Sequence, residues 1–180
     1  GACEIAFTGN GDQACVAFGD CIYIFDLANP AQPQVLGSLS CGYPSGVKVK
    51  NNYAFVADYS GMKMRVIDIS DPSKPAEVTS LNTPGYTTFI EIKEELAVVS
   101  CDYDGFIIVD ISNPQQPVQL GSCLNDEHRT CEIILDGIYA YVATEYYKGE
   151  IAVYDISDPA DITAVNKYNV IPSRTAVGLD

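Results

Sequence analysis

The chain has 180 residues, and 24 acidic against 10 basic side chains give it a formal net charge of −14. Hydrophobic residues make up 47% and charged residues 19%, a balance that excludes a disordered, highly charged chain. The negative charge disfavours nucleic acid and anionic lipid surfaces as partners and leaves cationic ligands and basic protein surfaces open. We therefore expect one folded domain over residues 1–180 that does not bind nucleic acid.

Two signals of membrane passage are missing from the sequence. No stretch approaches the roughly 18 continuous apolar residues of a membrane span, so direct membrane insertion is not expected. The first residues lack the basic region followed by an apolar region that marks a secretion signal. A signal removed before Gly1 stays open.

Seven cysteines are present, at positions 3, 15, 21, 41, 101, 123 and 131. The number is odd, so at least one has no partner within the chain. Cys15 and Cys21 flank an expected hairpin turn and could be cross-strand neighbours. We favour the interpretation of the cysteines as small apolar core residues over a disulfide framework.

Two short runs recur along the chain with the same period. The first contains Asp26, Asp68, Asp110 and Asp155, each followed three and four residues later by an Asn-Pro or Asp-Pro pair, with spacings of 42, 42 and 45 between the aspartates. The second precedes it at 13–17, 53–57, 96–100 and 139–143. Both runs are short and rich in β-branched or aromatic residues, which predicts strands and not helices.

The remaining segments of each repeat complete the pattern. Prolines such as Pro72 and Pro75 turn the chain after the Asp-containing strand. A third strand is expected after that turn, at 76–81 or 118–123, and a fourth before the next repeat, at 47–49, 89–92 and 131–135. Each repeat therefore predicts four short strands.

A repeat of about 40 to 45 residues with four antiparallel strands is the unit of a β-propeller blade. We predict an all-β propeller of four-stranded antiparallel blades at about 3–40, 45–82, 87–124 and 129–169, with 173–179 as the inner strand of a further blade. A sandwich or solenoid is less well supported. The blades either close as a ring of four or form an arc of a larger propeller, which we favour. An arc would expose blade edges and permit self-association.

The recurring runs Val66-Ile67-Asp68, Ile108-Val109-Asp110 and Val153-Tyr154-Asp155, with their Ser-Asp/Asn-Pro turns, resemble LVIVD repeats. That resemblance covers nearly the whole chain. It implies a β-propeller of a bacterial or archaeal kind that is often surface-associated, with no agreed catalytic motif, and hence an extracellular or cell-surface location. The chain departs from the pattern at Ala28, and at Ile162 where the other repeats have proline, which puts the turn geometry there in question.

Chain direction sorts the loops, because the links after strands two and four of a blade share one face. That face contains the Asp-Tyr-x-Gly loops at 58–61 and 102–105. We favour the interpretation that these residues form turns over the interpretation that they bind a ligand. The irregular segments of the longest spacing break the pattern and are the better candidate for ligand binding, although a solvated charged loop is the alternative. The predicted site residues are Asp126, Glu127, His128, Arg129, Glu145, Tyr146, Tyr147 and Tyr103.

Several chemistries are disfavoured by composition. His128 is the only histidine, so a histidine-based triad or a multi-histidine metal site cannot form within the chain. Asp102 and Asp104 have only a fragment of calcium-loop spacing. No nucleotide, zinc-protease or serine-hydrolase motif occurs, and no metal or cofactor is expected. We interpret the four repeated aspartates as turn-holding residues and not as a carboxylate ring.

Two functions follow from these observations. The first is a non-catalytic binding or scaffolding propeller that contacts a protein or a small polar or cationic ligand through the loop face. The alternative is a hydrolase with an axial, carboxylate-lined pocket that acts on a glycan or a cationic substrate.

Overall fold

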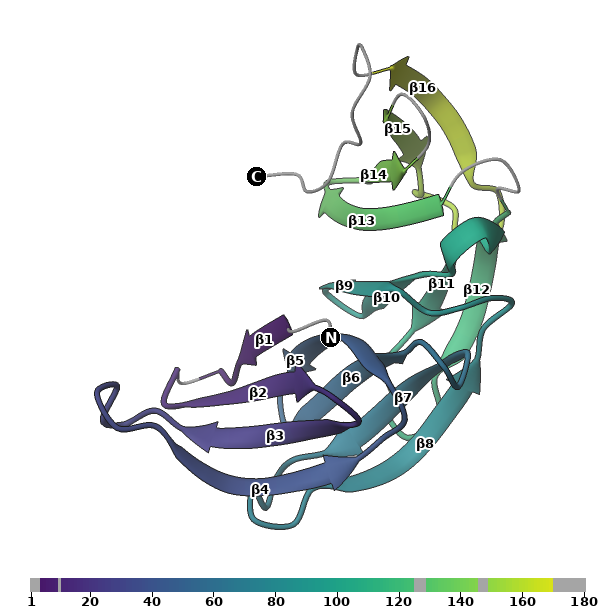
Figure 1. The fold of residues 1–180 in the computed structure, drawn as a ribbon. Helices are drawn as coiled ribbons and strands as arrows, with labels where there is room; N and C mark the ends of the chain where they lie inside the picture. Colours follow the sequence, from purple (N-terminus) through teal and green to yellow (C-terminus); the bar gives the residue numbers. More distant parts are fainter. Residues whose placement is uncertain (1–3, 10, 125–128, 146–148, 170–180) are drawn as a thin grey trace.

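The computed structural model describes residues 4–9, 11–124, 129–145 and 149–169. These residues form sixteen β-strands and one short 3₁₀ helix. The strands make four sheets, each of four antiparallel strands in chain order, which confirms the predicted all-β propeller fold (Figure 1). None of the helical turns in the described residues is long and apolar enough to cross a membrane.

Each sheet is one blade, built from four strands that follow one another along the chain. Blade 1 contains β1 (Glu4–Phe7), β2 (Gln13–Phe18), β3 (Cys21–Asp26) and β4 (Gln34–Ser40). Blade 2 contains β5 (Pro44–Lys50), β6 (Tyr53–Asp58), β7 (Lys63–Asp68) and β8 (Ala76–Asn82). Blade 3 contains β9 (Phe89–Lys93), β10 (Leu96–Ser100), the 3₁₀ helix η1 (Asp102–Asp104), β11 (Phe106–Asp110) and β12 (Val118–Cys123). Blade 4 contains β13 (Arg129–Asp136), β14 (Tyr139–Glu145), β15 (Glu150–Asp155) and β16 (Thr163–Asn169).

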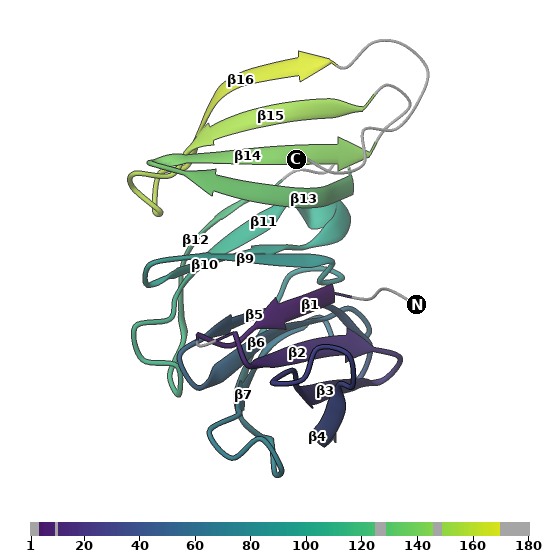
Figure 2. The ribbon, with the colours of Figure 1, turned by 90° about the vertical axis from the view of Figure 1, so that its left-hand side faces the viewer.

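The described residues form an open arc and not a closed ring of four. In Figure 1 the strands β1, β5, β9 and β13 lie on the inner side of the arc, and the blades extend outward to β4, β8, β12 and β16. Strand β1 lies apart from β13 in both views (Figures 1 and 2). The predicted further strand at 173–179 lies outside the described residues.

Three apolar cores lie between successive blades, because each sheet buries both faces only against its neighbours. The core between blades 1 and 2 contains Cys15, Ala17, Ile22 and Ile24 from blade 1 with Val47, Ala54, Val56, Ile67 and Ile69 from blade 2. Equivalent residues form the cores between blades 2 and 3 and between blades 3 and 4. The repeat therefore encodes the packing of one blade on the next.

The four repeated aspartates hold the turns that follow them, as predicted. Each carboxylate accepts a hydrogen bond from the backbone N–H two residues later, at 2.8–2.9 Å, in all four blades. The backbone donors Ser112 and Ser157 lower the pKa of Asp110 and of Asp155 below the usual value. One residue before each aspartate, the pairing of the third and fourth strands shifts register in every blade. This recurring bulge bends the outer strand at the same place.

The two departures from the repeat do not alter the turn. Where Ala28 replaces serine, its N–H still donates to Asp26 at 2.9 Å. Where Ile162 replaces proline, Asp161 N donates to the Asp158 carbonyl at 3.0 Å, as Lys74 N does to Asp71 in blade 2 at 2.9 Å. The hydrogen bonds of the turns that had been put in question are therefore kept, because backbone groups and aspartates that these repeats retain make them.

Glycine in the outer strand permits two of the blades to meet closely at the rim. Gly37 lies opposite Ile24 in blade 1, and a Cβ there would clash with the carbonyl oxygen of Pro72 in the next blade. Gly121 of blade 3 stands in the same relation to Pro159 of blade 4. The equivalent position in blade 2 is Thr79. The proline turns thus pack against the preceding blade where a glycine makes room.

The cysteines are free at every described position, from Cys15 to Cys131. Cys15, Cys41 and Cys101 are buried in the cores, and burial raises the pKa of Cys15 and of Cys101 to about 12. Cys15 lies opposite Ile24 and Cys21 opposite Phe18, so the expectation that these two cysteines could face each other was wrong. The interpretation as core residues holds for the buried three.

Candidate functional site

Three tyrosines from successive loops meet on the face that holds the links after strands two and four, which we call the first face. Tyr43 follows β4, Tyr59 follows β6 and Tyr86 follows β8. The Tyr59 and Tyr86 rings stack with their centroids 4.7 Å apart, and the Tyr43 ring meets Tyr59 edge-on at 6.1 Å. The tyrosines form one aromatic surface between blades 2 and 3.

A buried carboxylate holds this aromatic surface in place. Asp58, at the end of β6, is fully buried and accepts hydrogen bonds at 3.0 Å from the backbone N–H groups of Tyr43 and Gly61. Arg65 donates to the same carboxylate from Nε at 2.9 Å and from Nη2 at 2.7 Å. Tyr59 N donates to the Tyr43 carbonyl at 2.9 Å, which links the two loops directly.

The environment of Asp58 keeps it ionised. Burial by itself would raise the pKa of this carboxyl, but the hydrogen bonds from Tyr43, Gly61 and Arg65 together hold it below its usual value. No Cβ fits at Gly42 or Gly61, because each would meet the Asp58 carboxylate. The sequence Asp-Tyr-x-Gly at 58–61 is therefore turn chemistry, as interpreted, and the turn positions the tyrosines.

A cavity of about 560 Å³ opens beside the aromatic surface. It is lined by Tyr43, Ser45, Tyr59, Ser60, Thr88 and Arg129. These residues belong to blades 2, 3 and 4, and four of them lie at or next to the beginnings of the inner strands. The cavity thus lies where the inner side of the arc meets the first face.

Hydroxyl groups between the inner strands connect the blades below this cavity. Ser45 Oγ of blade 2 donates to the Thr87 carbonyl at 2.6 Å. Thr88 Oγ of blade 3 donates to the Thr130 carbonyl of blade 4 at 3.1 Å. The two donors occupy equivalent positions: Ser45 precedes the residue opposite Ala57, and Thr88 precedes the residue opposite Ser100. The same hydrogen bond therefore links two successive pairs of blades.

At the far side of the cavity, Arg129 joins two acidic side chains. Its Nε donates to Asp102 at 2.6 Å and its Nη1 to Glu145 at 3.1 Å. Burial would lower the pKa of Arg129, but these two partners raise it above its usual value. Asp102 is buried and has a φ of 57°, a left-handed conformation that is costly for a residue with a side chain.

The structure places three of the predicted site residues. Arg129 and Glu145 lie together, and Tyr103 lies on the same face, 56% exposed, next to Asp102. Five others lie outside the described residues: Asp126, Glu127, His128, Tyr146 and Tyr147. The site prediction did not include Ser45, Ser60 or Thr88, although the recurrence of a hydroxyl at equivalent positions 45 and 88 was a signal for two of them.

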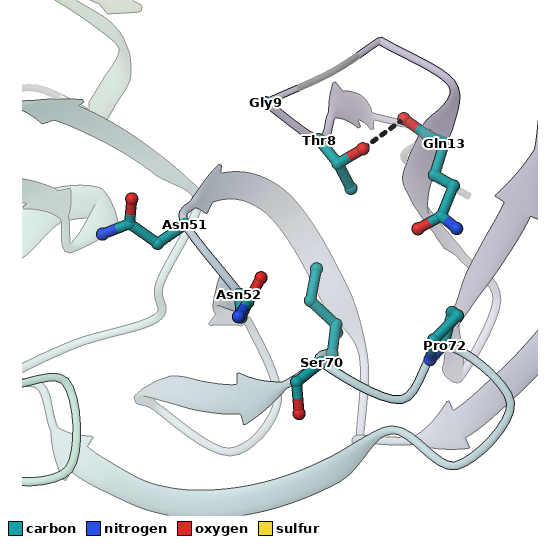
Figure 3. A pocket seen from close by; sticks show the side chains of 8 residues that line it. Thr8, Gly9, Gln13, Asn51, Asn52, Ser70 and Pro72 are labelled. Atoms are coloured by element: carbon teal, nitrogen blue, oxygen red, sulfur yellow. Dashed lines mark hydrogen bonds between the residues drawn. The ribbon is translucent and has the colours of Figure 1, made fainter.

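A second cavity, of about 510 Å³, lies on the opposite face, which we call the second face. It is lined by Thr8, Gly9, Gln13, Asn51, Asn52, Ile69, Ser70 and Pro72 (Figure 3). These residues come from the β1–β2 and β5–β6 turns and from the proline turn of blade 2. The lining is free of formal charge and rich in side-chain amides.

The inner strands carry an ion triad and not an open carboxylate pair. Lys48 Nζ of β5 lies 3.1 Å from Glu4 Oε1 and 3.1 Å from Glu91 Oε2. Glu4 Oε2 also accepts a hydrogen bond from Val47 N at 2.7 Å. Burial raises the pKa of Glu4, against the attraction of Lys48. Both carboxylates share one ammonium group. Within the described residues, no group of acidic, cysteine or histidine side chains could hold a metal ion.

A model of the LVIVD repeat matches residues 2–40, 41–83, 84–125 and 129–170. The chain belongs to the LVIVD-repeat family. The matched segments follow the four blades of the structure, so each repeat of the family corresponds to one blade. No curated protein matches the chain.

Solved structures share the fold of this LVIVD-repeat chain. Hydrazine synthase of Kuenenia stuttgartiensis matches with a TM-score of 0.74 and 17% identity over 93% of this chain and 48% of that chain. The Cps50 (Swd1) β-propeller domain of Myceliophteria thermophila matches with a TM-score of 0.74 and 18% identity, over 100% of this chain and 58% of that domain. A protein from Lactobacillus plantarum matches with a TM-score of 0.78 and 15% identity, over 96% of this chain and 57% of that protein. At such identities the likeness shows the fold alone, and the chain spans about half the length of these structures.

Proposed function

We propose that this LVIVD-repeat propeller is a non-catalytic binding module that holds a protein segment or a small polar or cationic ligand in the first-face cavity. The observation that carries the proposal is the convergence of Tyr43, Tyr59 and Tyr86 beside that cavity, fixed by a buried ion pair. Scaffold turns recur in every blade, whereas this aromatic surface occurs between blades 2 and 3 alone within the described residues.

The chemistry of the lining favours ligands with both an apolar and a polar side. Tyrosine rings offer flat amphipathic surfaces that attract cations and stack on sugars or aromatic groups. Ser60 and Thr88 add hydroxyl groups, and the formal charge of −14 favours the approach of cations. Arg129 is engaged with Asp102 and Glu145, so we do not expect it to select an anionic ligand.

Tyrosine fluorescence offers a direct test, because the chain contains twelve tyrosines and no tryptophan. The probes are choline, arginine amide and methyl glucoside, titrated separately. We expect at least one to bind, and Tyr59→Ala to weaken it about tenfold, within the range of a desolvated cation–π or stacking contact. Tyr103→Ala is the matched control, because Tyr103 lies on the same face outside the cavity lining. If none of the probes binds, or if Tyr59→Ala and Tyr103→Ala behave alike, the cavity is not the site.

The neighbouring loop residues remain a prediction. Variants His128→Ala and Tyr146→Ala should leave folding intact and weaken the same interaction if the irregular segments contribute. Unchanged affinity in both would limit the site to the cavity lining. The hydrolase alternative is not favoured, since the inner-strand carboxylates of Glu4 and Glu91 are both bound to Lys48.

A second candidate function, scaffolding by self-association, has its own observation. Val47, Ile90 and Ile133 occupy one repeat position and are fully buried against the preceding blade, but Ile5 at that position in blade 1 is 53% exposed. We propose that the blade 4 face of a second copy covers it, because that face carries the equivalents of the residues that pack there between blades.

Sedimentation equilibrium over a range of concentrations tests the association. We expect Ile5→Glu to remain monomeric at concentrations where the unchanged chain associates. Val118→Glu is the matched control, since Val118 is 56% exposed on an outer strand. A chain that stays monomeric throughout, or two variants that associate equally, would contradict the proposal.

A further inference from the structure

On the second face, a lysine of one blade contacts the next blade in two successive pairs of blades. Lys50 Nζ, at the end of β5, donates to the Glu94 carbonyl of blade 3 and lies 2.7 Å from Glu95 Oε2. Lys93 Nζ, at the end of β9, donates to the Gly137 carbonyl of blade 4 at 3.3 Å. Both lysines thus place an ammonium group on the turn that joins the first two strands of the next blade.

The strand register identifies the residue that takes this position in blade 1. Lys50 lies opposite Tyr53, and Lys93 lies opposite Leu96, each at the open end of the first hairpin. In blade 1 the residue opposite Gln13 is Thr8, whose N–H donates to the Gln13 carbonyl at 3.0 Å. A threonine therefore stands where the next two blades have a lysine, and its side chain carries no ammonium group.

Blade 2 still has the backbone carbonyl that would accept a hydrogen bond from a lysine of blade 1. The turn residues Glu94 and Gly137 have φ angles of 52° and 57°, and Asn51 at the same position of blade 2 has 54°. The three turns therefore have a residue with left-handed φ at the same position. The Asn51 carbonyl is the equivalent of the two carbonyls that receive a lysine.

The second-face cavity lies where that lysine would be. Thr8, Gln13, Asn51 and Asn52 line it, with the side-chain amide of Asn51 pointing away from the other three in Figure 3. Its volume of about 510 Å³ is in the range of small-ligand sites. In the part of the chain that the structure describes, the side-chain amides of Gln13, Asn51 and Asn52 make no hydrogen bond to other protein groups. The side-chain oxygens of Gln13 and Asn52 are thus available to a donor that enters the cavity.

We propose that the second-face cavity between blades 1 and 2 binds a primary ammonium group, which takes the place of the lysine bridge found between the other blades. The ammonium donates to the Asn51 carbonyl and to side-chain amide oxygens, and its alkyl stem packs on Ile69 and Pro72. The ligand is a lysine side chain of a partner protein or a free alkylamine. This site is independent of the first-face function, because the two cavities lie on opposite faces.

Two probes distinguish the sources of the ammonium group. They are N-acetyl-lysine methylamide, which presents a lysine side chain on a peptide backbone, and n-butylamine, which presents the amine alone. Binding is followed by the ¹⁵N side-chain amide signals of Asn51, Asn52 and Gln13, with n-butanol as the neutral control. Binding of the lysine derivative alone indicates a protein partner, and binding of both probes indicates the amine itself.

Two kinds of variant give the decisive comparison: one that places a lysine in the cavity and one that removes a lysine from the equivalent position of another blade. Thr8→Lys supplies an internal ammonium and should weaken probe binding at least about tenfold, the worth of a charged hydrogen bond. Thr8→Ser retains a hydroxyl and should bind as before. Lys93→Thr removes the bridge between blades 3 and 4 and should create a second site, which raises the probe stoichiometry from one toward two.

The proposal is overturned if neither amine shifts the Asn51 and Asn52 signals more than n-butanol does. Equal affinity of Thr8→Lys and Thr8→Ser for the amine would also overturn it. Should Thr8→Lys fail to fold, the stoichiometry of Lys93→Thr decides alone, and a value unchanged from the parent chain counts against the proposal.

Discussion

The face of blade 2 that packs on blade 1 and the outward face of blade 1 are built from equivalent residues, yet only the former is covered. Val47 in β5 is fully buried, whereas Ile5 at the same position of β1 is 53% exposed and Phe7 is 59% exposed. The apolar pattern of a repeat thus specifies an interface, and the neighbour decides whether it becomes a core. Blade 1 retains the pattern and hence the capacity to bind another blade.

The largest expected effect is a difference in the free energy of unfolding between a substitution in a covered blade face and one in the exposed face of blade 1. Ile90→Ala should lower the free energy of unfolding by about 3 kcal/mol, because it leaves a cavity between blades 2 and 3. Ile5→Ala should cost less than about 1 kcal/mol, since half of its side chain already contacts water. Urea unfolding at low protein concentration measures both. Similar losses would mean that the blade 1 face is buried in solution.

A second comparison concerns Arg65, whose position in blade 1 is occupied by Tyr23. Arg65→Gln removes the partner of the fully buried Asp58 and should cost about 3 kcal/mol, because the carboxylate stays buried without its counter-charge. Tyr23→Gln should have little effect, because blade 1 has no carboxylate at that place: Phe18 takes the position of Asp58. Thermal unfolding of the two variants checks this, and equal losses would contradict it.

The pH dependence of stability should differ between the unchanged chain and a variant without the Asp58 carboxylate. The pKa of Asp58 in the folded chain lies below its usual value near 3.8, so the ionised carboxylate stabilises the fold above that value. This stabilisation is lost as the pH falls through the lower folded pKa. We expect the unchanged chain to lose more stability than Asp58→Asn between about pH 5 and pH 2. Parallel urea midpoints over that range would show that Asp58 does not contribute.

The smallest effect tests the hydroxyl links between the blades. Ser45→Ala removes the hydrogen bond to the Thr87 carbonyl and should cost about 1 kcal/mol. Ser38→Ala is the control, because Ser38 lies on the outer strand β4. A loss no larger than that of the control would show that the link adds nothing to the blade 2 and blade 3 interface.

The sequence was sufficient for the blades, because strands, turns and the repeated aspartates recur with a regular period. It was not sufficient for the site, because the same letters take different places when a turn changes length. Asp58 ends β6 opposite Lys63, but the Asp-Tyr-x-Gly of blade 3 begins one position later, so Asp102 instead meets Arg129. The meeting of Tyr43, Tyr59 and Tyr86 depends on three separate loops and no spacing reveals it.

The glycines at the outer rim have a consequence for the curvature of the arc. Blades 1 and 2 interlock through Gly37, and blades 3 and 4 through Gly121, but Thr79 stands at that place in blade 2. The joint between blades 2 and 3 therefore lacks the glycine that lets the proline turn approach at the other two joints, and other contacts set the curve there. A molecule held between Tyr59 and Thr88 would contact the blades on both sides of this joint.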